Sequence, residues 1–246
     1  IIQVDMNPDR IGLTKKVTVG ICGDAKQVAQ QILDKLSSDA GNLGRDERKN
    51  LIHKTKSAWL QTLAGLDHEE DDPGTVWNKE ARERDKDRMS PRQAWRAIQD
   101  ALPKDAIISS DIGNNCAIGN AYPTFEKGRK YLAPGLFGPC GYGFPAILGA
   151  KIGCPDTPVI GFAGDGAFGI SMNEMSSCAR EEWPAITMVI FRNYQWGAEK
   201  RNSILWFDDN FIGTELDPEL SYSKVANACG LKGVTCKTME ETTKAI

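Results

Sequence analysis

The sequence predicts an α/β protein whose main sheet is parallel. Short apolar runs alternate with helical patterns along residues 90–246, and strands that alternate with helices are typical of a parallel sheet. The run at residues 185–191 is apolar and β-branched, as expected for a strand buried on both faces. A glycine turn follows the strand-like residues 159–163, at the end of the strand where open α/β sheets bind ligands.

The first part of the chain, residues 1–36, has the pattern of the end of an α/β unit. Residues 1–4 form a short strand pattern, and a helix is predicted after Asp24, a suitable N-cap. Val28, Ile32 and Leu36 recur at helical spacing on one face of that helix. The chain begins within a predicted strand and ends within a helical pattern at residues 239–246, so we expect it to be an internal piece of a longer polypeptide.

Residues 37–89 have a different composition and are predicted to be a charged helical linker. An amphipathic helix is expected over residues 45–63, followed by an acidic break and an almost wholly charged stretch. Two interpretations remain open. The segment is either a solvated linker anchored by a few apolar side chains such as Trp59 and Leu60, or a recognition surface made of its charges.

Residues 90–246 carry the alternating pattern. Ser90 and Gln93 form a capping box around Pro91, and Pro103 stops the helix that follows. The remaining elements are expected in this order: a strand and turn at 106–115, a glycine-rich segment at 135–153, a strand and glycine turn at 157–166, a helix at 172–182, and a strand at 185–191.

Composition excludes several classes of function. The net charge of −3 gives no electrostatic footprint for nucleic acid or an anionic membrane, and no apolar stretch reaches the about 18 residues of a transmembrane helix. The seven cysteines are scattered without a C-x-x-C pair, which favours a reducing, cytoplasmic setting over disulfides or a zinc site. The two histidines lie in the charged region, so triad chemistry is not expected.

Two polar side chains follow two successive strands of the predicted sheet. Asp165 comes directly after the strand ending at residue 163, and Asn193 after the strand ending at residue 191. Ligands bind outside the carboxyl ends of such strands, so the two side chains can converge on one point. Both are hard oxygen donors, which suits Mg²⁺ and a phosphate. Gly164 and Gly166 would let the backbone approach that phosphate.

A second interpretation starts from the same glycines, because residues 164–169 also match the dinucleotide pattern G-x-G-x-x-G. In that case Asp165 would face a pyrophosphate with like charge. The second strand would also be expected to end in an acidic residue that binds a ribose, whereas here it ends in Arg192 and Asn193. An NADP-dependent reductase therefore remains a rival from another class, as does a non-catalytic scaffold fragment.

The spacing from Gly164-Asp165-Gly166 to Asn193 resembles the fold motif of thiamine-diphosphate-dependent enzymes, in the superfamily of acetolactate synthase and pyruvate oxidase. That family usually ends the motif with two asparagines, where this chain has Arg192 and Asn193. The resemblance implies thiamine diphosphate and Mg²⁺ as cofactors. It also implies that Asp165, Asn193 and the backbone carbonyl of Gln195 hold the metal.

The same resemblance extends to other cofactor contacts. The sequence DIGNN resembles the family's diphosphate turn, which assigns Asn114 and Asn115 to phosphate, and Gly164, Gly166 and Ala167 would complete that site. Residues 135–153 resemble the segment that holds the aminopyrimidine and bends the cofactor, with a contact at Gly138. Cys140 stands where the family usually has a bulky methionine or leucine.

The resemblance also divides the chain. It makes residues 1–36 the end of a Rossmann-like central domain and residues 90–246 the diphosphate-binding domain, joined by the linker at 37–89. Residues 191–233, together with 110–143, resemble the branch that converts sulfoacetaldehyde and phosphate to acetyl phosphate and sulfite. The alternatives within the superfamily are acetolactate synthase and 2-oxoacid decarboxylases. Both proposed substrates are anions, and the candidate cations are Arg192, Lys200 and Arg201.

One catalytic group is expected outside this chain. In the family, a glutamate from the pyrimidine-binding domain activates the cofactor, in a site formed between two subunits. The resemblance therefore implies a homo-oligomer, at least a dimer, and no catalytic residue is assigned within residues 1–246. It also implies that this chain alone is inactive.

Overall fold

The computed structural model describes the chain except for residues 38–40, 42–43, 69–88, 126–129, 181 and 209. The chain forms two compact units, Ile1–Ala64 and Gly65–Ile246, which are described separately. This division falls inside a helix and differs from the boundaries predicted at residues 36/37 and 89/90, which remain predictions. The charged stretch at 69–88 lies outside the described residues.

The first unit contains a small parallel β-α arrangement. Its strands β1 (Ile2–Asp5) and β2 (Val19–Cys22) pair in parallel, with a 3₁₀ turn, η1 (Pro8–Arg10), between them in sequence. Helix α1 (Ala25–Lys35) begins after Asp24, whose side chain accepts a hydrogen bond from the Gln27 N–H, so the predicted cap is confirmed. The helix expected over residues 45–63 is present as the longer α2 (Arg45–His68).

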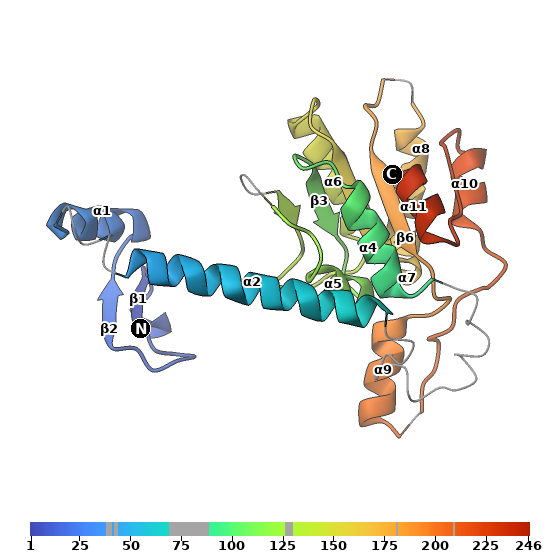
Figure 1. Cartoon of the computed structure of the whole chain (residues 1–246). Helices are drawn as coiled ribbons and strands as arrows, with labels where there is room; N and C mark the ends of the chain where they lie inside the picture. The colour runs from blue at the N-terminus through green and yellow to red at the C-terminus, as the bar shows by residue number, and fades with distance from the viewer. Residues whose placement is uncertain (38–40, 42–43, 69–88, 126–129, 181, 209) are drawn as a thin grey trace. The chain divides into compact units, whose positions relative to one another are not determined.

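The second unit is built on a four-stranded parallel sheet with strand order β4-β3-β5-β6 (Figure 1). The parallel sheet predicted from the alternating pattern is therefore confirmed. The strands are β3 (Ile107–Ser110), β4 (Tyr131–Leu132), β5 (Val159–Gly164) and β6 (Thr187–Phe191). The helical elements are α4 (Pro91–Ala101), α5 (Asn114–Gly119), α6 (Gly143–Gly153), α7 (Asp165–Ser171), η3 (Met172–Glu174), α8 (Met175–Cys178), α9 (Gly197–Trp206), α10 (Tyr222–Ala228) and α11 (Met239–Ala245).

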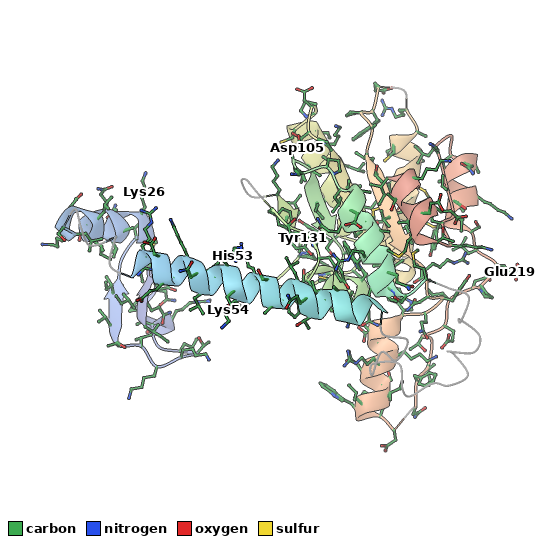
Figure 2. All side chains as sticks on the ribbon, in the orientation of Figure 1. Lys26, His53, Lys54, Asp105, Tyr131 and Glu219 are labelled. Carbon is green, nitrogen blue, oxygen red and sulfur yellow. The ribbon has the colours of Figure 1, made fainter. Side chains whose placement is uncertain are left out.

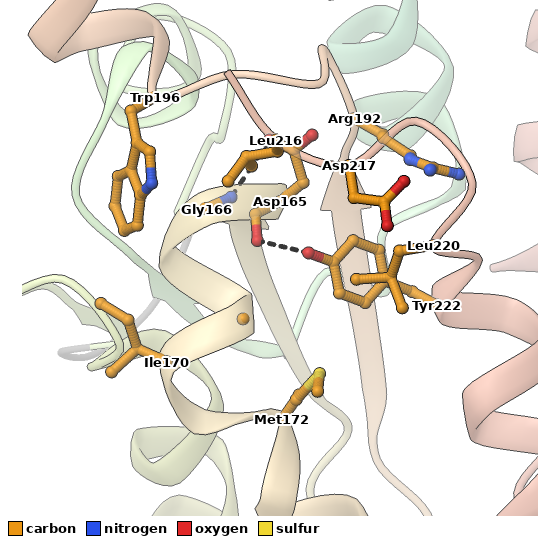
Figure 3. Close-up of a pocket in the computed structure, with 11 residues that line it drawn as sticks. Asp165, Gly166, Ile170, Met172, Arg192, Trp196, Leu216, Asp217, Leu220 and Tyr222 are labelled. Atoms are coloured by element: carbon orange, nitrogen blue, oxygen red, sulfur yellow. Dashed lines mark hydrogen bonds between the residues drawn. The ribbon is translucent and has the colours of Figure 1, made fainter. Parts of the chain in front are cut away.

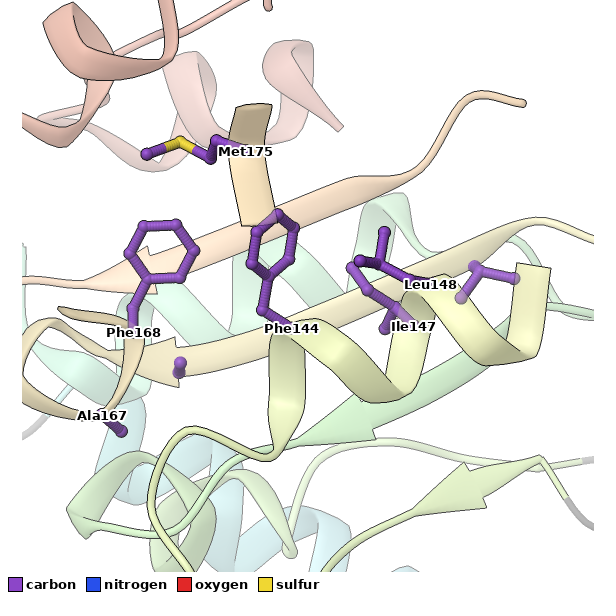
Figure 4. Packing of buried hydrophobic residues seen from close by; sticks show 8 residues of the cluster. Phe144, Ile147, Leu148, Ala167, Phe168 and Met175 are labelled. Atoms are coloured by element: carbon purple, nitrogen blue, oxygen red, sulfur yellow. The ribbon is translucent and has the colours of Figure 1, made fainter. Parts of the chain in front are cut away.

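Strand β5 lies at the centre of the sheet and separates two apolar layers. On one side, Val159 and Ala163 pack with Phe144 and Ile147 of α6 and Phe168 of α7 (Figure 4). On the other side, Phe162 contacts Trp95 of α4, with ring centroids 4.5 Å apart. Successive side chains of a strand point to opposite faces, so β5 serves both layers.

Helices α4 and α11 of the second unit lie against each other although they are distant in sequence. The predicted capping box at Ser90 is present, because Ser90 and Gln93 exchange side-chain and backbone hydrogen bonds. From α11, the Thr243 hydroxyl donates to the carbonyl of Ala97 at 3.4 Å. Helix α11 therefore packs against α4.

One predicted helix differs from the structure. The sequence pattern placed it at residues 172–182, after the glycine turn. Instead, the chain turns from β5 directly into α7 at Asp165 and then continues through η3 and α8 as far as Cys178. Gly166, directly after Asp165, has no side chain, and this leaves room for the ring of Trp196 to pack on its backbone.

The composition-based expectations concern the surface and the cysteines. No helix among the described residues is both long and apolar enough to cross a bilayer. All seven cysteines have free thiols. In the charged region, His53 lies exposed on α2 (Figure 2).

Candidate cofactor and metal site

The polar residues predicted from sequence follow the carboxyl ends of three adjacent strands. Asn114 and Asn115 begin α5 shortly after β3, Asp165 begins α7 at the end of β5, and Asn193 follows β6. Because β3, β5 and β6 are parallel neighbours, these residues share one edge of the sheet. The convergence inferred from spacing is present in the fold.

Asp165 is the most enclosed of these side chains, at 2% exposure. Its Oδ1 accepts the N–H of Gly166 at 3.1 Å, and its Oδ2 accepts the N–H of Tyr194 at 2.7 Å. The hydroxyl of Tyr222 donates to the backbone carbonyl of Asp165 at 2.8 Å (Figure 3). The carboxylate is thus fixed in position by two N–H groups, and a carboxylate can accept further bonds or a cation through its remaining lone pairs.

Burial raises the pKa of the Asp165 carboxyl above its ordinary value. The N–H groups of Tyr194 and Gly166, and the nearby guanidinium of Arg192, act in the opposite direction. Burial also raises the pKa of Tyr222, to which the charge of Asp165 contributes. The electrostatics of this site are therefore dominated by loss of solvent around Asp165.

The loop after β6 carries the other two predicted metal ligands. Asn193 Oδ1 accepts the N–H of Gln195 at 3.3 Å, and the carbonyl of Gln195 accepts the N–H of Gly197 at 2.9 Å. Each of these oxygens has a second lone pair for a ligand. Between them, Tyr194 has a left-handed backbone with φ of 63°, an unusual conformation for an aromatic residue.

A second segment, residues 214–216, holds this loop in place. Leu216 donates its N–H to the carbonyl of Tyr194 at 2.9 Å, and Trp196 donates to the carbonyl of Thr214 at 2.7 Å. Gln195 and Glu215 form an antiparallel bridge. The strained conformation of Tyr194 is therefore fixed by backbone hydrogen bonds from outside the loop.

The two predicted diphosphate asparagines border two glycines. A methyl group added to Gly197 would lie 2.7 Å from Nδ2 of Asn193 and 3.1 Å from Nδ2 of Asn114. The side-chain amides of Asn193 and Asn114 therefore both lie next to the backbone of Gly197. A methyl group on Gly164 would lie 3.6 Å from Oδ1 of Asn115. Asn115 is buried, and its Nδ2 has no hydrogen-bond partner among the residues that the structure describes. A buried amide without a partner is costly, so this Nδ2 is suited to donate to an acceptor on a bound ligand.

The glycine-rich segment around residues 138–143 is attached to the end of β3. Gly138 has a left-handed φ of 69°. Cys140 is half-buried against the core, and burial, followed by the charges of Asp111 and Glu199, raises the pKa of its thiol. The attachment is made by Asp111, which accepts hydrogen bonds from the N–H groups of Gly141 and Gly143.

The three candidate cations have different surroundings. Arg192 lies over the ring of Tyr194, 4.4 Å from its centroid, and donates through Nη2 to the carbonyl of Pro218 at 2.9 Å. Lys200 forms an ion pair with Glu215. Arg201 is exposed on α9.

A cavity of about 400 Å³ adjoins Asp165 on the side of α7 that faces residues 214–222 (Figure 3). Arg192 lines it, whereas Lys200 and Arg201 do not. Its lining is completed by Asp165, Gly166, Gly169, Ile170, Met172, Trp196, Leu216, Asp217, Leu220 and Tyr222. Arg192 is thus the candidate cation with access to a space beside the predicted metal ligand.

Sequence reasoning missed three residues of this region. Asp111 directly follows a buried strand, and that position could have identified it. Trp196, whose ring lies 2.8 Å from the position of a methyl group on Gly166, gave no periodic signal. Tyr222 is 57 residues from Asp165 in sequence, and only the fold reveals their contact.

Ala167 has a different place from the other predicted cofactor residues. It is 4% exposed and its side chain belongs to the apolar cluster shown in Figure 4. Its side chain therefore contributes to packing, and a cofactor would meet only its backbone.

Comparison with known proteins identifies the class. Residues 111–246 match the family described as "Thiamine pyrophosphate enzyme, C-terminal TPP binding domain", and the chain belongs to this family. The glycines at 164–169 are therefore part of a domain of this family, and the dinucleotide interpretation is set aside.

The relatives are more specific. The whole chain is 76% identical to a probable sulfoacetaldehyde acetyltransferase of Rhizobium meliloti (strain 1021) and 72% identical to a sulfoacetaldehyde acetyltransferase of Roseovarius nubinhibens. It spans 42% and 41% of the lengths of these relatives, respectively.

A solved structure supports the fold assignment. The thiamine diphosphate-dependent 4-hydroxybenzoylformate decarboxylase of Rhodococcus jostii RHA1 matches with a TM-score of 0.59 and 25% identity. The match covers 64% of this chain and 29% of that protein.

Proposed function

We propose that the full-length protein is a thiamine-diphosphate- and Mg²⁺-dependent acyltransferase that converts sulfoacetaldehyde and phosphate to acetyl phosphate and sulfite. The high identity to two sulfoacetaldehyde acetyltransferases over the whole of this chain supports the reaction. One structural observation carries the cofactor part of the proposal: the Asn115 amide, whose Nδ2 has no partner within the described parts of the chain, lies buried beside Gly164, at the strand edge that also holds Asp165. A diphosphate oxygen is a suitable acceptor for that amide.

The roles of the chain's own residues follow from their chemistry. Asp165, Asn193 and the carbonyl of Gln195 supply the hard oxygen ligands that Mg²⁺ prefers. Asn114 and Asn115 donate amide N–H groups to the diphosphate, while Gly164 and Gly166 allow its close approach. Thiamine diphosphate, when bound, supplies the electron sink for carbon–sulfur bond cleavage, which no protein side chain provides.

The remaining predicted contacts complete the assignment. Gly138 and Cys140 would contact the part of the cofactor beyond the diphosphate. Arg192, Lys200 and Arg201 remain the candidates for binding the sulfonate and phosphate groups. The position of Arg192 on the cavity supports it most strongly, because its guanidinium stands near Asp165.

The rest of the proposal concerns the whole protein. We expect an oligomer, at least a dimer, whose activating glutamate lies outside residues 1–246, and this chain alone should be inactive. A reducing, cytoplasmic setting is the one that the scattered cysteines favour.

The test is an assay of full-length protein with sulfoacetaldehyde and phosphate, with thiamine diphosphate and Mg²⁺ supplied or withheld. Acetyl phosphate and sulfite should appear in equal amounts, and only when both cofactors are supplied. Turnover of pyruvate with release of CO₂, and none of sulfoacetaldehyde, would assign the protein to acetolactate synthase or a decarboxylase instead. Assembly without cofactor binding or turnover would favour the scaffold alternative.

A further inference from the structure

Asp111 is a buried carboxylate that the proposed reaction does not use. It is 0% exposed and comes directly after β3. Its Oδ1 accepts the N–H groups of Ile112 at 2.8 Å and Gly141 at 3.0 Å, and its Oδ2 accepts the N–H of Gly143 at 2.7 Å. A buried carboxylate is tolerated only when its oxygens are satisfied in this way. All three donors belong to the backbone.

The hydrogen bonds of Asp111 join two segments that are distant in sequence. Gly141 and Gly143 lie 30 and 32 residues beyond Asp111. The backbone N–H of Asp111 itself donates to the carbonyl of Phe162 in β5 at 2.7 Å. Asp111 is therefore fixed to the central strand through its backbone and to the 141–143 turn through its side chain.

The two glycines show how little freedom this attachment leaves. A methyl group on Gly143 would lie 3.0 Å from Cβ of Asp111 and 3.1 Å from its backbone nitrogen. Gly141 has φ of +87°, and a methyl group there would lie 2.9 Å from Cγ2 of Ile170. The close approach to Asp111 therefore requires glycine at 143, while the left-handed backbone and the contact with Ile170 require it at 141.

Asp111 stands between two groups of proposed cofactor contacts. Asn114 and Asn115, assigned to the diphosphate, follow three and four positions later in the sequence. Gly138 and Cys140, assigned to the part of the cofactor beyond the diphosphate, immediately precede the turn that Asp111 binds. We propose that Asp111 is a positioning residue that sets the distance between these two groups of contacts. This inference rests on the proposed function.

The inference separates two parts of one ligand. If Asp111 only aligns the 138–143 segment, its loss should leave the diphosphate contacts intact and weaken only the contacts beyond them. Inorganic pyrophosphate with Mg²⁺ probes the first set of contacts alone, whereas thiamine diphosphate with Mg²⁺ probes both. A general structural role would weaken binding of the two ligands equally.

The experiment compares full-length wild type with Asp111→Asn by calorimetric titration of both ligands. Asparagine keeps the shape of aspartate but presents an N–H₂ group to backbone donors. Thiamine diphosphate affinity should fall about tenfold to a hundredfold, as when a group that orients ligand contacts is lost. Pyrophosphate affinity should change less than about twofold. The exposed Asp156→Asn serves as the matched control and should change neither affinity.

Hydrogen exchange supplies a readout that needs no ligand. In Asp111→Asn without cofactor, the amides of Gly141 and Gly143 should exchange at least about tenfold faster, because each loses a charge-assisted bond. Should Asp111→Asn not fold, Gly143→Ala disturbs the same contact from the other side and should give the same split between the two ligands.

Three results for Asp111→Asn would overturn the inference: an equal fall in affinity for both ligands, no fall in affinity for either ligand, or unchanged hydrogen exchange at the amides of Gly141 and Gly143. Failure of the proposed function is seen separately in the wild type, which would then bind neither thiamine diphosphate nor pyrophosphate in the presence of Mg²⁺. In that case the inference falls with the proposed function, even if the exchange rates change as expected.

Discussion

Asp111 after β3 and Asp165 after β5 are buried carboxylates at the ends of adjacent strands, yet the backbone satisfies them to different degrees. Asp111 accepts three N–H groups, two of them from the distant 141–143 turn. Asp165 accepts two, one from its neighbour and one from the loop after β6. The Asp111 carboxylate accepts one more backbone hydrogen bond than that of Asp165, so the Asp165 carboxylate keeps more lone-pair capacity for an added ligand. Similar placement on the sheet therefore does not mean similar chemistry.

The largest effect is expected when Asp165 is replaced. Asp165→Asn removes the charge that would hold Mg²⁺, and affinity for thiamine diphosphate in the presence of Mg²⁺ should fall at least about a hundredfold, beyond the loss typical of an orienting residue. Calorimetry on full-length protein measures this, with Asp156→Asn as control. Unlike Asp111→Asn, this variant should lose affinity for pyrophosphate as well. Binding that equals the wild type would refute the metal-ligand assignment.

The glycines on either side of Asp165 should separate packing from binding. Gly166→Ala would bring a methyl group within 2.8 Å of the Trp196 ring, so unfolding free energy should fall by about 1–3 kcal/mol, as in overpacked cores. In Gly164→Ala the added methyl group would lie 3.6 Å from its nearest neighbour, Asn115 Oδ1. This variant should keep the melting temperature and weaken pyrophosphate binding, because the methyl group would stand beside the Asn115 side chain assigned to the diphosphate. If Gly164→Ala melted at a lower temperature than Gly166→Ala, the interpretation that Gly166 serves packing and Gly164 serves binding would be contradicted.

Replacing Arg192 tests whether the cation beside Asp165 binds a substrate anion. Arg192→Met should raise the KM for phosphate or sulfoacetaldehyde about tenfold in steady-state assays, since a lost charge-assisted bond is worth about 1.5–3 kcal/mol. Arg180→Met, at an exposed position after α8 to which no binding role is assigned, is the control and should change KM little. If Arg192→Met instead weakened cofactor binding with KM unchanged, its contacts with Pro218 and Tyr194 would be its main role.

The smallest effects are expected when the hydroxyl group of Tyr222 or of Tyr131 is removed. Tyr222→Phe removes the bond to the Asp165 carbonyl, and Tyr131→Phe removes a bond of 2.7 Å to Oδ1 of Asn120 on the β3 side. Each should lower unfolding free energy by about 1 kcal/mol, measured by denaturant titration. Only Tyr222→Phe should also weaken Mg²⁺-dependent cofactor binding, by a few-fold. Equal effects of the two variants on binding would show that the Tyr222 contact is not special to the site.

Much of the sheet could be predicted because local patterns determine it. The apolar run at 185–191 and the glycine turn after residue 163 place two strands and their ends, and parallel pairing then brings Asp165 and Asn193 to one edge. The start of α7 could not be predicted in the same way, because Asp165 and its glycines resemble a turn until the fold places the Trp196 ring against Gly166.

The parts of the site that were missed depend on contacts between distant residues. Nothing near Tyr222 indicates that its hydroxyl reaches the carbonyl of Asp165. Likewise, two of the three partners of Asp111 are backbone amides 30 and 32 residues away, and backbone amides carry no side-chain signal in a sequence. The left-handed conformation of Tyr194 is also invisible locally, because residues 214–216 impose it.

The contact between Tyr222 and Asp165 has a consequence for how the protein is made. During synthesis, residues 107–191 can emerge and pair as a sheet before Tyr222 leaves the ribosome. The carbonyl of Asp165 gains its partner only after another 57 residues have been added, and closing such a long loop carries an entropic cost that local pairing does not. In a nascent chain the parallel sheet would therefore form before Tyr222 can fix the backbone at Asp165.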